Sequence, residues 1–191
     1  LDPFLGVLGQ SGGPDIQGST SVALGDVDKN GSIDAVIGNA IQPNRHYRNN
    51  GGLTPFVNTE TQDITTAIFQ TAAIKLVDID NDGDLDTLVG DRNGLNRIHF
   101  NDSATDDIFL GIPSSDLSTN IWTSSAIATG DIDNDGDLDL LVANGVTVTV
   151  NRPNVAFLNN GTPDPFNGSG AANITADAVV STSIAVGDID G

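Results

Sequence analysis

The residues best suited to chemistry in this sequence are aspartates that recur in short loops. Within nine positions, oxygen-bearing side chains occupy positions 1, 3, 5 and 9, and glycine occupies position 6. The three complete copies are Asp26, Asp28, Asn30 and Asp34; Asp78, Asp80, Asp82 and Asp86; and Asp131, Asp133, Asp135 and Asp139. Carboxylates at this density repel one another unless a cation lies between them. Hard oxygen ligands favour calcium, which accepts about six to eight of them.

Further features of each loop support a calcium cage. The backbone carbonyl of position 7 is expected to supply another ligand, from Ser32, Asp84 or Asp137. Glycine at position 6 permits the bend that returns later ligands to the ion. Mg²⁺ fits less well, because it is smaller and keeps its waters. We expect the first copy to bind most weakly, since Asn30 replaces an aspartate there, whereas a fourth copy, Asp188 and Asp190, is incomplete.

Two other interpretations of these loops compete with a calcium cage. The helix-loop-helix calcium motif begins with the same pattern, but it requires Glu at position 12. This chain has Ile37, Val89 and Val142 there. Asp-rich and Gly-rich loops also occur as solvated turns that bind nothing. Three complete copies in constant phase favour metal sites over that alternative.

The loops recur because the whole chain repeats. Four phenylalanines precede the first aspartates of the four copies at a constant interval: Phe4, Phe56, Phe109 and Phe166. We therefore predict one domain over residues 1–191, with repeats at 1–53, 54–106 and 107–163 and an incomplete repeat at 164–191.

The elements that must position the loops read as β-strands, with no convincing helical period. A first strand precedes each loop and alternates small residues with Val, Ile or Leu, so we expect it to pack closely on its small-residue face. The segments are 21–25, 73–77, 126–130 and 183–187 for this strand; 35–38, 87–90 and 140–143 for a second; and 45–48, 97–100 and 155–158 for a third, which contains an aromatic residue in each repeat. The recurring Phe is expected to open a fourth. Four short strands in roughly 50 residues predict an all-β chain of β-propeller blades, about three and a half of them.

Composition excludes several functions. The 191 residues include 26 acidic and 7 basic side chains, a formal net charge of −19. Nucleic acids and anionic membrane surfaces are therefore poor partners. No apolar run approaches the roughly 20 residues of a membrane span. Because the chain has no Cys, disulfides and thiolate metal sites are impossible.

The third loop, Gly-Asp-x-Asp-x-Asp-Gly-Asp-Leu-Asp over residues 130–139, is followed by an apolar strand, an aromatic residue shortly before an Asn-Asn-Gly turn, and a Phe. This combination resembles the FG-GAP/VCBS-type repeat of integrin-like calcium-binding β-propellers, over essentially the whole chain. The resemblance implies one four-stranded blade per repeat, with calcium in a loop between two strands. It also implies an extracellular or cell-surface module for adhesion, assembly or sugar recognition. The expected partners are other protein chains or extracellular glycans.

Residues outside the loops give weaker signals. The chain offers only His46 and His99 as general bases and no Cys nucleophile, so we predict no enzyme; part of a polysaccharide-degrading enzyme remains an alternative. Arg45 and Arg97 occupy matching positions and could bind an acidic ligand, although ion pairs explain them equally well. Trp122, the only Trp, could stack on a sugar in a carbohydrate-binding propeller, although its phase favours packing between blades.

The two halves of the repeat occur in unequal number. Four copies run from the Phe to the first aspartate, but only three run from the aspartate to the next Phe. We expect the natural chain to continue beyond Gly191, or the missing strands to come from another molecule. Unpaired blade edges would then predispose the chain to self-association.

Overall fold

The computed structural model describes residues 18–56, 61–64, 67–102, 108–109, 114–117, 123–145, 152–174 and 180–189. All regular secondary structure in these ranges is β-strand, which confirms the predicted all-β class. None of the described residues belongs to a helix with the length and hydropathy of a membrane span.

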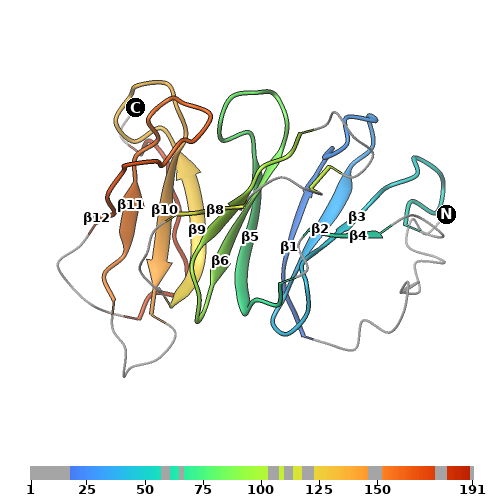
Figure 1. The fold of residues 1–191 in the computed structure, drawn as a ribbon, viewed down its shortest axis with the longest axis horizontal. Coiled ribbons are helices and arrows are strands. Elements are labelled where there is room, and N and C mark those ends of the chain that lie inside the picture. Colours follow the sequence, from blue (N-terminus) through green and yellow to red (C-terminus); the bar gives the residue numbers. More distant parts are fainter. Residues whose placement is uncertain are drawn as a thin grey trace.

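The described strands form three four-stranded antiparallel sheets, which lie side by side in chain order (Figure 1). In each sheet, strands consecutive in sequence are neighbours. The first sheet contains β1 (Ser19–Gly25), β2 (Asp34–Asn39), β3 (Arg45–Tyr47) and β4 (Thr61–Asp63). The second contains β5 (Thr71–Val77), β6 (Asp86–Asp91), β7 (Arg97–His99) and β8 (Ser115–Asp116). The third contains β9 (Ser124–Gly130), β10 (Asp139–Asn144), β11 (Val155–Phe157) and β12 (Ala172–Asn173).

Strand register fixes both ends of every acidic loop. The last pairs of the β1–β2, β5–β6 and β9–β10 ladders are Gly25 with Asp34, Val77 with Asp86, and Gly130 with Asp139. Position 9 of each loop is therefore the first residue of a second strand. The ladder thus holds this carboxylate beside the start of its own loop.

The hydrophobic core lies between adjacent sheets. One cluster joins the first and second sheets and includes Val36, Ile74 and Val89; another joins the second and third and includes Leu88 and Leu140. A Cβ at Gly38 would lie 2.6 Å from Cγ1 of Ile74. Large side chains of one sheet thus fill space left by small residues of the preceding sheet.

Two strand predictions were wrong. Phe56, Phe109 and Phe166 lie in turns, and β4, β8 and β12 begin five or six residues later. Phe109 and Phe166 are buried in the two core clusters. This Phe therefore recurs at a constant interval because it packs between sheets, and it does not begin a strand. Each fourth strand comes from the residues after the next Phe and pairs with the third strand of the same sheet.

The second wrong prediction is a strand at 183–187, where no strand is assigned. A first strand is defined by its ladder to a second strand. No described segment follows residues 180–189 to supply that ladder. Side-chain packing nevertheless remains, because a Cβ at Gly130 would lie 2.6 Å from Cγ1 of Val186.

Candidate metal centre

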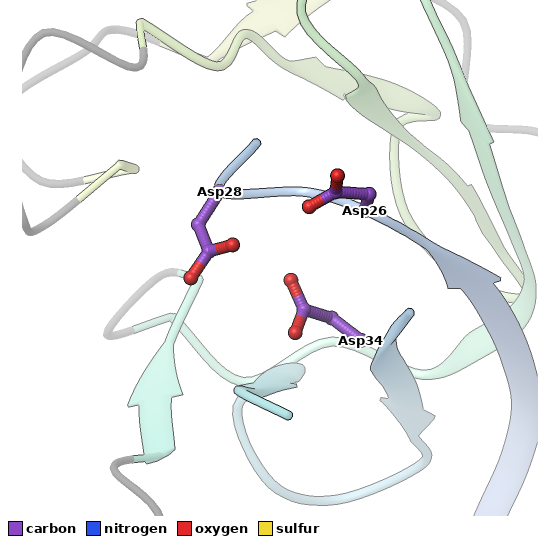
Figure 2. A group of neighbouring side chains, drawn as sticks. All are labelled: Asp26, Asp28 and Asp34. Carbon is purple, nitrogen blue, oxygen red and sulfur yellow. The ribbon is translucent and has the colours of Figure 1, made fainter. Parts of the chain in front are cut away.

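The aspartates at positions 1, 3 and 9 converge in all three complete loops. Each trio offers carboxylate oxygens that lie within 4.8 Å of one another: Asp26, Asp28 and Asp34; Asp78, Asp80 and Asp86; and Asp131, Asp133 and Asp139. Figure 2 shows the first trio, whose three carboxylates turn toward a common space. The sequence spacing therefore brings nine of the predicted ligands together in three matching groups.

Backbone donors shape each loop around its first aspartate. The amide of the position 6 glycine donates to the carboxylate of position 1, over 2.9 Å from Gly31 to Asp26 and 3.0 Å from Gly83 to Asp78. The third loop repeats this contact between Gly136 and Asp131. These glycines have φ values of 85°, 90° and 98°, in the left-handed region that glycine adopts without steric cost. The predicted bend is confirmed.

Position 9 is the most constrained ligand. Asp34, Asp86 and Asp139 are fully buried. In Asp86, one oxygen accepts from the Ile79 amide at 3.1 Å and the other from the Asn101 amide at 2.9 Å. The other two loops contain the same pair of contacts. Each carboxylate is thereby fixed in one orientation toward its trio.

The charge of these trios is poorly compensated in the second and third loops. Burial raises the pKa of Asp86 to about 7. Burial and the neighbouring Asp82 raise the pKa of Asp80, and desolvation and Asp135 raise that of Asp133. A cation between the carboxylates would reverse these effects, because it favours the ionised form.

Unpartnered oxygens at position 1 test whether a metal fits. Oδ1 of Asp26 and Oδ1 of Asp78 are buried and have no hydrogen-bond partner among the described residues. A buried acceptor without a partner is costly. Both residues belong to the converging trios. The donor set is entirely oxygen, so these residues fit a hard divalent cation.

Positions 5 and 7 differ from positions 1, 3 and 9. Asp82 and Asp135 lie outside the converging trios. The oxygens of Asn30, Asp82 and Asp135 instead accept from the amides of position 7, which are Ser32, Asp84 and Asp137. These contacts hold the position 7 backbone; ligation by its carbonyl and by position 5 stays a prediction.

Contacts between adjacent loops were missed by the sequence analysis. Position 4 has a left-handed backbone in every loop, with φ of 56° at Lys29, 60° at Asn81 and 63° at Asn134. The Lys29 ammonium pairs with Asp84 of the second loop, which raises the pKa of this lysine. Asn81 donates over 2.8 Å to Asp137 of the third loop. No local pattern marks position 4, because its partner lies in the next repeat.

A second missed group consists of asparagines that follow the third strands. Asn101 is buried, and its side-chain amide donates to the Val27 carbonyl of the preceding loop at 2.8 Å and to the Leu85 carbonyl of its own loop at 3.3 Å. Asn159 makes the equivalent pair of contacts. Their constant place, two residues after the third strand in each repeat, is a signal that the sequence contained.

The remaining predicted residues lie apart from the trios. Arg45 donates to Asp63 over 2.8 Å and Arg97 to Asp116 over 2.6 Å, each across a pair of neighbouring strands. Trp122 and Asp190 fall outside the described residues, and Asp188 is exposed.

The two histidines are both buried. His46 pairs with Val36, whereas His99 pairs with Thr87, one register position away from the matching Leu88. The two side chains therefore point to opposite faces of their sheets, as the sequence predicts. Burial lowers the pKa of His99 to about 4, so this ring is neutral near pH 7.

Comparison with known proteins agrees with this geometry. The FG-GAP-like repeat family matches the chain twice, over residues 26–89 and 78–142. Each match begins at position 1 of one acidic loop and ends in the strand that directly follows the next acidic loop, which is β6 for the first match and β10 for the second. No curated protein matches the chain. The two overlapping matches cover more than half of the sequence, and the chain belongs to the FG-GAP-like repeat family.

Proposed function

We propose that this chain is a calcium-binding structural and interaction module, and that its three sheets are blades of a β-propeller. The observation that supports it most directly is the convergence of three matching aspartate trios, two of which contain a buried oxygen without a partner. Calcium bound there would be architectural, since the trios lie in loops that join the first two strands of each sheet.

The loops favour calcium over magnesium. Positions 1, 3 and 9 supply carboxylates from two ends of a loop that the strand ladder closes, and the neighbouring backbone offers carbonyl oxygens. Magnesium demands near-ideal octahedral geometry and retains water, whereas calcium accepts more ligands in a looser arrangement. Each bound ion would add two positive charges to a chain of net charge −19. By reducing the repulsion among the carboxylates, the bound ions would stabilise the fold.

The proposed setting is extracellular or at a cell surface, in adhesion or assembly, with protein chains or glycans as partners. Extracellular calcium modules work at weak affinities, about 10⁻⁴ to 10⁻³ M. A chain without cysteine has no disulfides to hold its loops, and bound calcium would stabilise them instead. We propose no catalytic role, because the two histidines are buried and no thiol is present.

Thermal unfolding with and without calcium tests this function. Saturating calcium is expected to raise Tm by about 10 °C or more, since each site filled at about 100 Kd contributes about 2.7 kcal/mol. The double variant Asp80→Ala and Asp133→Ala should lose most of this rise. Asp164→Ala removes an exposed carboxylate outside the loops and should keep it. An unchanged Tm in calcium would refute the metal sites and return the loops to solvated turns.

A further inference from the structure

The three loops share one geometry but face different protein cations. In the first loop, Nε of Arg48 pairs directly with Oδ2 of Asp28. Asp28 is the position 3 carboxylate of the trio, and its side chain is 6% exposed against 39% for Arg48. Nε2 of His46 also lies 3.2 Å from Asp34 in the same trio. The first loop therefore has basic groups of its own against two of its three converging carboxylates.

The second loop has a cation in a different place. The Lys29 ammonium pairs with Asp84 at position 7, and this carboxylate is not one of the converging three. In the third loop, position 7 is Asp137, which receives the neutral amide of Asn81. Across the described ranges, no Lys, Arg or His forms an ion pair with Asp131, Asp133 or Asp139. The positive charge that the protein itself places beside the loop carboxylates thus decreases from the first loop to the third.

From this gradient we infer that Arg48 is an internal counter-ion of the first loop and that calcium fills the third loop first, the second next and the first last. The inference rests on the proposed calcium function. Calcium entering the first loop must share Asp28 with the guanidinium or displace it, and the two cations repel each other. In the second loop the ammonium repels calcium from outside the trio. In the third loop, none of the described residues places such a positive charge against the incoming calcium.

The first loop also contains Asn30 where the others have aspartate, and this difference alone would weaken calcium binding. Arg48→Met separates the two causes, because it removes the charge, retains most of the apolar stem and leaves Asn30 in place. Removing one unit charge about 4 Å from a divalent ion is expected to strengthen calcium binding at the first loop about thirtyfold. Arg48→Lys, which keeps the charge, should remain close to wild type.

One glycine per loop reports each site separately. The amides of Gly31, Gly83 and Gly136 donate to the first aspartates of the three loops. The experiment is therefore a calcium titration of the ¹⁵N-glycine-labelled full chain, followed by the chemical shifts of these three amides. We expect the midpoint for Gly136 at the lowest free calcium, that for Gly83 next and that for Gly31 at the highest. In Arg48→Met, only the Gly31 midpoint should move to lower calcium.

Arg152 provides the matched control, since it is exposed and forms no ion pair with the described loop residues. Arg152→Met should leave all three midpoints unchanged. The inference is overturned if Gly31 titrates together with or before the other two, or if Arg48→Met and Arg152→Met behave alike while calcium binds. Absence of any calcium-dependent shift would overturn the proposed function itself. Thermal unfolding of calcium-free Arg48→Met checks its fold, and its Tm should fall by a few degrees because Asp28 loses its ion pair.

Discussion

At the residue scale, the environment gives chemically identical aspartates different tasks. Position 9 is fully buried and accepts two backbone amides, whereas position 5 accepts the amide of position 7 and lies outside the trio. The position 9 carboxylate is therefore oriented for a cation, and the position 5 carboxylate holds the loop backbone. Ligand count read from composition alone would treat these carboxylates as equal.

At the residue scale, we predict that calcium binding at the second loop is coupled to release of a proton from Asp86. Its pKa in the calcium-free fold is about 7, above the usual value of about 3.9 in an unfolded chain. Between pH 4 and 7 the fold binds a proton that the unfolded chain has released, so this contribution to calcium-free stability is lost as pH rises through that window. Calcium must displace the same proton. We expect calcium affinity at the second loop to rise by up to about tenfold per pH unit from pH 5.5 to 7 and then level off.

The Gly83 amide, titrated with calcium at several pH values, measures this linkage. Calorimetry in two buffers of different ionisation enthalpy gives the protons released. Release that is greatest at the lowest pH of the series and small at pH 8 is the expected result. A Gly83 midpoint that stays constant from pH 5.5 to 7.5 would contradict it.

At the element scale, packing between sheets depends on pairing large with small residues and on polar contacts that recur. Ile74 fills the space beside Gly38, and Val186 fills the space beside Gly130. Hydroxyl contacts repeat at the starts of the first strands, where Thr71 donates to Asn44 and Ser124 donates to Asn96, each over 2.9 Å. These contacts align each sheet with the one before it.

Gly38→Ala tests the close approach of the first two sheets. Its Cβ would lie 2.6 Å from Cγ1 of Ile74 and 2.7 Å from Cγ2 of Thr71, so the sheets must separate or the side chains must leave their rotamers. Overpacking of this kind costs about 2 kcal/mol of unfolding free energy, measured by urea denaturation in saturating calcium. Gly170→Ala is the matched control, because nothing lies within 4 Å of its added Cβ. Equal stabilities of the two variants would show that the interface yields without cost.

At the scale of the whole molecule, none of the other described sheets covers the outer face of β1. Val22 and Leu24 are 59% and 64% exposed. They match Ile74 and Leu76 of β5, which pack against the first sheet. An open face that repeats the surface used between sheets is suited to a second copy of the chain, joined head to tail.

Leu24→Asp tests this association. Light scattering of the wild type in calcium is expected to give a mass that rises with protein concentration, and the variant should remain at 19.7 kDa, because a carboxylate placed in an apolar interface is costly to desolvate. Leu53→Asp alters another exposed leucine, away from β1, and should behave as wild type. A wild-type mass of one chain at every concentration would exclude the association.

The sequence by itself determined the features that depend on local pattern and phase. Alternating residues predict the first strands, and the positions of Asp26, Asp28 and Asp34 predict a trio, because the bend at Gly31 and the start of β2 are both local. The same pattern in three repeats makes each prediction stronger, since one accidental match would not recur in phase.

Only the tertiary structure decided which groups from different parts of the chain meet. The pairing of Lys29 with Asp84, the contact of Asn101 with Val27 and the burial of Phe109 in a turn all join adjacent repeats. Arg48 approaches Asp28 because β3 returns beside β2 and places its end next to the first loop. Such contacts depend on how sheets pack and strands return, and no periodicity within a single segment encodes that geometry.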